Sequence, residues 1–264
     1  MKNVTQKVRF LKFIRFHTIL ITIFAAFLLL KDNLWFKQEM PDKNFISLIM
    51  TRTHMDQCID TGCIGEYTIQ DLGMATASGL AIGTISNKTY ILTANHFCNS
   101  EQYSLGMSPL DGYIISKIHV SDVDGNLWSS KIVYADLKSD LCLIESEMSA
   151  VNSIRLSSTM PAVGEKVFAL SAPGSIAMKE VGLHLEGYFS GCDYQNMCYY
   201  TIPSTFGSSG SVILNRKRQI IGMIQMSPRD FNFTSIGVGL VAMKRFLENA
   251  SSDLKIDLIN WSVQ

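Results

Sequence analysis

The sequence lacks an excess of charge of either sign. Its 264 residues hold 23 Lys and Arg against 23 Asp and Glu, so the formal net charge is zero. This balance predicts no basic face, and we therefore expect no nucleic-acid partner. The six cysteines also lack the paired Cys-x-x-Cys spacing of a zinc knuckle, which argues against structural zinc. We expect neither a metal nor an organic cofactor.

The N-terminal segment lacks a small-x-small cleavage site. Residues 1–15 carry five basic residues and no acidic one, and residues 16–30 are apolar apart from His17 and two threonines. A basic start followed by an apolar run is typical of an export signal, and the positive block argues against a buried helix. We therefore favour an uncleaved signal anchor over a secreted protein. The rest of the chain would then lie in the periplasm or outside the cell.

Three stretches carry residues that are suited to acyl transfer. A Gly/Ser loop, residues 207–211, leads into the apolar run 212–214 and could expose the Ser209 hydroxyl beside converging backbone N–H groups. The apolar run 89–94 leads into a small-residue corner that carries His96, and Asp140 stands before the apolar run 141–146. A Gly/Ser loop alone is more often an ordinary turn. The chain order His96, Asp140, Ser209, however, is that of a serine-protease triad.

Further motifs follow in order over residues 75–245. They are Ser78-Gly-Leu-Ala-Ile, Ile91-Leu-Thr-Ala-Asn-His, Asp124-Gly-Asn, Lys131-Ile-Val-Tyr-Ala-Asp, Ser139-Asp-Leu-Cys-Leu-Ile, Val163-Gly-Glu-Lys-Val-Phe-Ala-Leu, Gly207-Ser-Ser-Gly-Ser, Ile221-Gly-Met-Ile and Gly237-Val-Gly-Leu-Val-Ala. With this set the chain resembles a trypsin-like serine peptidase of the chymotrypsin fold, and within it the bacterial HtrA/Deg-type protease domain. We expect no PDZ domain, because no PDZ-like segment follows these motifs.

The resemblance implies an all-β fold of two six-stranded antiparallel β-barrels, to which we add an N-terminal transmembrane helix and a short C-terminal helix near 243–249. We divide the chain into a basic segment and anchor (1–30), a membrane-proximal stalk (31–73), a first barrel (74–155), a second barrel with the helix (156–250) and a tail (251–264). Runs rich in β-branched and aromatic residues between turn signals support the strands. The site would lie between the barrels.

The resemblance also assigns a role to each site residue. Ser209 is the expected nucleophile, preferred over Ser208 and Ser211 because it alone sits in the Gly-x-Ser-Gly frame. His96 would act as general base and then as general acid, and Asp140 would orient it. The N–H groups of Gly207 and Ser209 would form the oxyanion hole. Because the base must be neutral, activity should fall in acid. Many relatives carry Asp or Asn where this chain has Ser208, and Gly where it has Ser211.

The expected partner is a polypeptide substrate, whose side chain at the cleaved position would enter a primary pocket. The resemblance places the primary pocket at Ile202, Pro203, Ser204, Thr205, Ile224, Gln225 and Met226. None of these is acidic, so strong selection for Lys or Arg is not expected. We expect small or medium apolar side chains, and a second hypothesis is a catalytically silent module that binds peptides at the same place. The oligomeric state is not predicted.

The six cysteines would face an oxidising compartment. We expect two disulfides that close small loops, Cys58 with Cys63 and Cys192 with Cys198. Cys98 and Cys142 each lie two residues after a predicted triad member, as a further bridge or as buried thiols, and we favour buried thiols. The other histidines, His17, His54, His119 and His184, have no partners at catalytic spacing and are expected to be ordinary residues.

Overall fold

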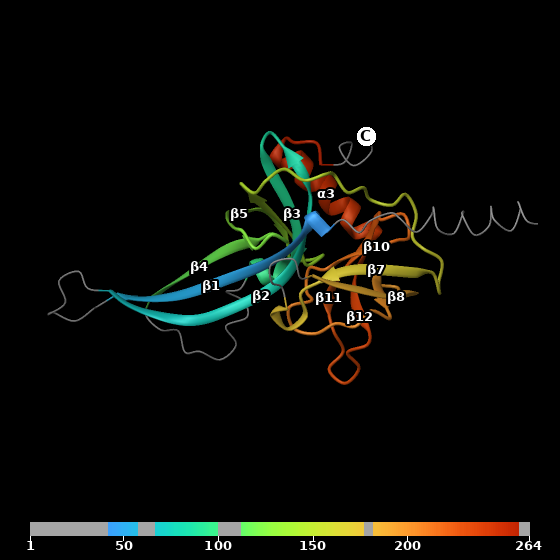
Figure 1. The fold of residues 1–264 in the computed structure, drawn as a ribbon, viewed down its shortest axis with the longest axis horizontal. Helices are drawn as coiled ribbons and strands as arrows, with labels where there is room; N and C mark the ends of the chain where they lie inside the picture. The colour runs from blue at the N-terminus through green and yellow to red at the C-terminus, as the bar shows by residue number, and fades with distance from the viewer. Residues whose placement is uncertain (1–41, 58–66, 100–111, 177–181, 259–264) are drawn as a thin grey trace, which may run out of the picture. The chain divides into compact units, whose positions relative to one another are not determined.

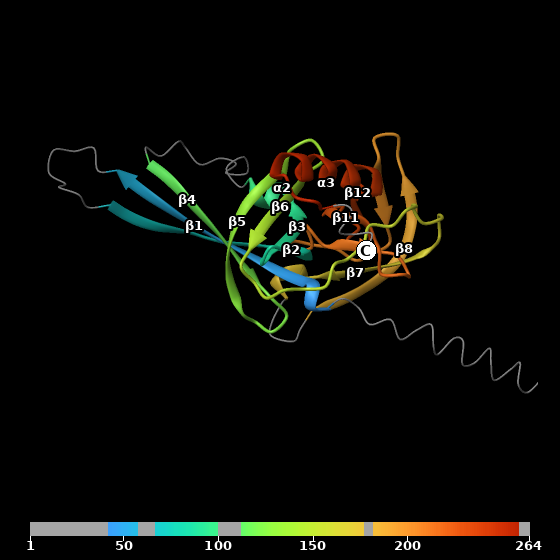
Figure 2. The same ribbon diagram turned by 90° about the horizontal axis from the view of Figure 1, so that it is seen from above.

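The computed structural model describes residues 42–57, 67–99, 112–176 and 182–258. The predicted anchor at 16–30 and the pair Cys58 and Cys63 lie outside these ranges. Within them, no helix has both the length and the apolar character to cross a membrane. The described residues all lie in one compact unit, and its strands form two closed barrels (Figures 1 and 2).

The first barrel has the strand order β1-β2-β3-β6-β5-β4. Its strands, all antiparallel to their neighbours, are β1 (Phe45–Gln57), β2 (Tyr67–Ile85), β3 (Lys88–Ala94), β4 (Gly112–Ser121), β5 (Leu127–Asp136) and β6 (Leu141–Ser146). A short 3-10 helix, η1 (Asp42–Asn44), precedes β1, and a four-residue helix, α2 (Asn95–Cys98), follows β3. The expected turn at Asp124-Gly-Asn joins β4 to β5, where the Asp122 carboxylate accepts a bond from the Asn126 N–H (2.9 Å).

The first strand corrects the predicted domain boundary. We expected a stalk over 31–73, but β1 and the first part of β2 lie there and pair over their whole length, from Phe45 with Leu80 to Gln57 with Tyr67. The side chains of Ile46, Leu48 and Met50 are fully buried in the core of the first barrel. β1 is therefore the sixth strand of the first barrel, and its pairing with β4 closes that barrel. Figures 1 and 2 show β1, β2 and β4 running side by side.

The second barrel has the strand order β10-β11-β12-β9-β8-β7. Its strands are β7 (Lys166–Ser171), β8 (Leu183–Cys192), β9 (Met197–Tyr200), β10 (Val212–Leu214), β11 (Ile220–Met226) and β12 (Ser235–Gly239), and a 3-10 helix, η3 (Pro173–Ser175), follows β7. Side chains in β8 alternate in burial, as expected of a strand with one face in the core. The core of this barrel centres on Tyr200, Ile213 and Ile221. Because the Tyr200 phenol is buried, its pKa is raised.

The C-terminal helix α3 (Leu240–Leu254) is longer than the expected 243–249. It packs on β11 and β12 of the second barrel and on β5 of the first. The rings of Phe246 on α3 and Tyr134 on β5 lie 5.2 Å apart. The helix therefore joins the two barrels and helps to fix how they meet.

Candidate active site

The structure brings His96 and Asp140 together through the pairing of β3 with β6. Ala94, the last residue of β3, pairs with Leu141, the first residue of β6. His96 Nδ1 lies 2.8 Å from Asp140 Oδ2, and the His96 N–H donates to Asp140 Oδ1 (2.7 Å). One carboxylate therefore holds both the ring and the backbone of the histidine, which fixes the ring's orientation. If Nδ1 carries the proton in this pair, Nε2 is left to act as a base.

Asp140 itself has an uncommon backbone conformation. Its φ of 51° lies in the left-handed region, which a non-glycine residue adopts only when its surroundings hold it there. The carbonyl of Asp140 accepts bonds from the Asn95 N–H (3.0 Å) and from Gln225 Nε2 (3.0 Å). The preceding turn is fixed by Asp136, whose carboxylate accepts bonds from Ser139 Oγ (2.6 Å) and from the N–H of residue 138 (3.0 Å). Burial would raise the pKa of Asp136, but these bonds lower it.

A disulfide joins the two segments that carry this pair. Cys98 and Cys142, each two residues beyond a predicted triad member, are bonded to each other. Our preference for buried thiols was therefore wrong. The bridge ties the end of α2 to β6 and limits how far His96 can move from Asp140.

The loop that carries Ser209 is set by two glycines in positive-φ conformations. Gly207 has φ 87° and Gly210 has φ 86°, which favours glycine at both positions. A Cβ at Gly210 would clash with the Ser78 carbonyl oxygen and the Thr93 hydroxyl. The loop from the second barrel therefore packs against the end of β3, just before α2 and His96. This close approach explains why the sequence has glycine directly after Ser209.

Ser78 on β2 anchors the same loop across the two barrels. Its N–H donates to the Ser209 carbonyl (2.9 Å) and its hydroxyl donates to the Gly207 carbonyl (2.8 Å). The hydroxyl also accepts a bond from the Ala172 N–H (2.9 Å). Ser78 is fully buried, so no solvent competes for these bonds. No local pattern in the sequence points to this role, because residues 78 and 207 are 129 positions apart.

Two N–H groups of the loop have no acceptor. Within the described parts of the chain, neither the N–H of Gly207 nor that of Ser209 takes part in a hydrogen bond. The carbonyl of Phe206, in the peptide unit that contains the Gly207 N–H, accepts a bond from the Gly174 N–H (2.6 Å). Because the C=O and N–H of a trans peptide point in opposite directions, this bond turns the Gly207 N–H away from Gly174. These are the two donors that the sequence predicted for an oxyanion.

The three loop serines differ in what their hydroxyls can do. Ser208 and Ser211 are buried; Ser208 Oγ accepts a bond from the Thr205 N–H (3.2 Å), and Ser211 Oγ bonds to Ser171 Oγ (2.8 Å). Ser209 is partly exposed, and its hydroxyl donates to the Gln225 carbonyl (3.2 Å). Among the described residues, no hydrogen bond joins Ser209 to His96. Ser209 therefore has the accessible hydroxyl, in a rotamer that does not engage His96.

The seven predicted pocket residues fall into two groups. Ile202 and Ile224 are buried in the core of the second barrel. Two buried polar side chains bond within the protein: Ser204 Oγ donates to the Thr234 carbonyl (3.1 Å), and Gln225 Nε2 donates to backbone carbonyls near Asp140. These four side chains therefore point away from solvent. The exposed members, which stay predicted pocket residues, are Pro203, Thr205 and Met226.

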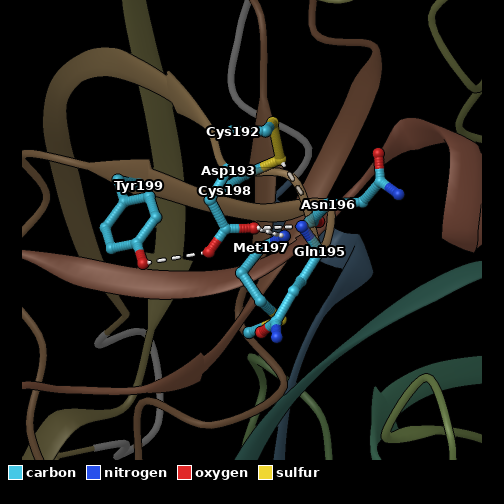
Figure 3. The surroundings of a disulfide bond; sticks show 7 residues. All are labelled: Cys192, Asp193, Gln195, Asn196, Met197, Cys198 and Tyr199. Atoms are coloured by element: carbon cyan, nitrogen blue, oxygen red, sulfur yellow. Dashed lines mark hydrogen bonds between the residues drawn. A yellow bond between two sulfur atoms is a disulfide. The ribbon is translucent and has the colours of Figure 1, made fainter.

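The second described disulfide, between Cys192 and Cys198, confirms a predicted pair. It closes the β8–β9 hairpin (Figure 3). In the turn, the Asp193 carboxylate accepts bonds from the N–H groups of Gln195 (2.8 Å) and Met197 (3.0 Å). This bridge lies wholly within one hairpin and carries no predicted site residue.

Comparison with known proteins agrees with this architecture. A trypsin-like peptidase domain matches residues 77–223. No curated protein sequence matches the chain. Among solved structures, the serine endoprotease from Yersinia pestis is similar at 16% identity and a TM-score of 0.57, over 81% of this chain and 65% of that one. This chain therefore spans about 65% of the length of the Yersinia protein.

Two structures of the protein Rv3671c from M. tuberculosis are also similar. An inactive mutant form has 9% identity and a TM-score of 0.55, with 80% of this chain and 88% of that chain covered. The active form of the protease has 11% identity and a TM-score of 0.54, with 79% and 81% covered. These likenesses concern the fold, whereas the domain match covers more than half of the sequence. The chain therefore belongs to the trypsin-like peptidase family of serine hydrolases.

Proposed function

We propose that this protein is a serine endopeptidase that cleaves polypeptides through Ser209, His96 and Asp140. In the first step, Ser209 Oγ attacks the scissile carbonyl carbon and its proton passes to His96. The C–N bond then breaks, His96 gives that proton to the leaving amine, and an acyl group stays on Ser209. Water attacks the ester with His96 as base, and the acid product leaves.

One arrangement is the main support for this proposal: Asp140 orients the ring of His96, and the loop that carries Ser209 offers backbone N–H donors. Asp140 accepts a hydrogen bond from the His96 backbone and lies 2.8 Å from Nδ1. On the facing loop, the N–H groups of Gly207 and Ser209 have no acceptor among the described residues. Backbone N–H groups that have no protein acceptor and lie beside an accessible hydroxyl are suited to bind the oxyanion of acyl transfer.

The Ser209 hydroxyl must turn before it can react. It donates to the Gln225 carbonyl at 3.2 Å, a long bond for a hydroxyl donor. Rotation about the Cα–Cβ bond releases it at the cost of one modest hydrogen bond. Hydrogen bonds between catalytic groups are often loose before substrate binds, so the resting rotamer is compatible with the mechanism.

Labelling with a fluorophosphonate probe tests the mechanism. We expect the wild-type protein to be labelled at neutral pH, and Ser209→Ala and His96→Ala to lose labelling. Ser190→Ala, which changes an exposed serine on β8, is the matched control and should be labelled as the wild type is. If the folded wild-type protein is not labelled, the endopeptidase proposal is wrong and a silent peptide-binding module is favoured.

The N-terminal segment forms a separate part of the proposal. We infer from the basic residues 1–15 and the apolar run 16–30 that the protein is anchored in a membrane, with its peptidase domain outside the cytosol. Carbonate extraction of membranes tests this inference. Full-length protein should stay with the membrane pellet, and its release into the supernatant would exclude the anchor.

A further inference from the structure

Gln225 occupies an unusual place between the two barrels. It lies on β11 of the second barrel and is only 6% exposed. Its side-chain amide reaches the first barrel, where Nε2 donates to the carbonyls of Ser139 (2.6 Å) and Asp140 (3.0 Å). Its own backbone carbonyl accepts the hydroxyl of Ser209 (3.2 Å). One residue therefore contacts both the segment that holds the acid and the nucleophile.

The contact of Gln225 with Asp140 restrains the backbone at that residue. The bond from Gln225 to the Ser139 carbonyl restrains the peptide before Asp140, and with it the φ of 51°. Two donors to the Asp140 carbonyl restrain the peptide after it. One of these donors is the N–H of Asn95, directly before His96. The other is Gln225. Without the amide, the carbonyl of Ser139 would lose its side-chain donor and the peptide at Asp140 could turn.

We infer that Gln225 is a positioning residue that aims the Asp140 carboxylate at His96, an inference that rests on the proposed function. The side chain does not touch the reacting atoms. It acts by holding the backbone from which the carboxylate projects. This role differs from the substrate contact that we expected for Gln225 from sequence, because the Nε2 donor is bonded within the protein and is not available to a substrate side chain.

Gln225→Met tests the inference, because methionine has a similar length and no donor. We expect kcat/KM to fall about 10- to 100-fold, with most of the loss in kcat and similar loss for different peptides. A misaimed Asp140 supports the imidazolium less, so the acidic limb of the rate–pH profile should move to lower pH by roughly half a unit or more. A purely structural role would lower the amount of folded enzyme and leave the position of the limb unchanged.

Two further variants make the test decisive. Gln219→Met makes the same chemical change directly before β11, where the Gln219 amide oxygen accepts a bond from Asn215 Nδ2 (3.1 Å). Its pH profile should match that of the wild type. Gln225→Glu keeps the shape but places an acid against two carbonyls, so it should be at least as impaired as Gln225→Met. It carries the test if the methionine variant does not fold.

The outcomes separate this inference from the proposed function. If the wild-type protein neither labels nor cleaves, the proposed function fails. If the wild type is active and both Gln225 variants keep its kcat and its pH profile, the positioning role is wrong. A loss confined to KM, or to peptides with one kind of side chain, would also overturn it and would restore the substrate-contact interpretation.

Discussion

Replacement of Ser78 by alanine should disturb residues 207–211, the loop that carries the proposed nucleophile Ser209. The buried hydroxyl donates to the Gly207 carbonyl (2.8 Å) and accepts from the Ala172 N–H (2.9 Å). Alanine removes both bonds and leaves two buried backbone groups without this partner. The backbone bond from Ser78 to the Ser209 carbonyl (2.9 Å) does not depend on the side chain, so the loop should loosen around Gly207 rather than detach.

The magnitude follows from these two orphaned groups. Each buried backbone group left unsatisfied costs about 1–3 kcal/mol, so Ser78→Ala should lower the free energy of unfolding by about 2–6 kcal/mol. For a domain of this size, that corresponds to a fall in Tm of roughly 4–24 °C. Because the N–H of Gly207 is a proposed oxyanion donor, and a lost donor costs about 10²–10³ in kcat, its displacement should lower kcat roughly 10- to 100-fold.

A matched variant separates the two effects. Ser146, at the far end of β6, is 1% exposed, and its hydroxyl donates to the Ser129 carbonyl (3.0 Å) and accepts from the Met148 N–H (3.3 Å). Ser146→Ala should therefore lose comparable stability but keep the wild-type kcat. Urea unfolding and peptide hydrolysis well below the Tm measure both quantities. Equal losses of kcat in the two variants, or no loss in Ser78→Ala, would refute the proposed coupling.

Two other predictions concern the covalent and electrostatic supports of the fold. The Cys98–Cys142 bridge spans 44 residues and the Cys192–Cys198 bridge spans 6, so chain entropy predicts losses of about 4 and about 2 kcal/mol when each pair is replaced by alanine. Urea unfolding measures these losses, and only the first double variant should also lose kcat; equal activities would contradict the role of that bridge. Asp136→Asn should cost about 1 kcal/mol at neutral pH, because the amide cannot accept the same bonds. Since the folded-state pKa of Asp136 is lowered, its contribution is present above about pH 4 and is lost as the pH falls through the folded-state pKa. The stabilities of variant and wild type should therefore converge in acid, and a constant difference down to pH 2 would show that the charge is not responsible.

The local pattern was sufficient for most of the fold but not for its first strand. The strand β6 (Leu141–Ser146) coincides with the apolar run 141–146 that follows Asp140 in the sequence, because a short apolar run between turn signals favours a strand. β1 was missed although Ile46, Leu48 and Met50 alternate as core residues. Its segment matched the family poorly, and its partners, β2 and β4, are identified only once the barrel is closed.

In the site, too, the sequence indicates the residue types but not which residues contact one another. The antiparallel register pairs Thr93 with Cys142 and Ala94 with Leu141, so a straight continuation of β3 would place Cys98 opposite residue 137. The helix α2 instead turns the chain back, and Cys98 meets Cys142. The same turn brings the backbone and ring of His96 onto the Asp140 carboxylate. Residue type and chain order can therefore nominate a histidine, an acid and a cysteine pair, but their geometry depends on one short turn whose direction the flanking strands do not specify.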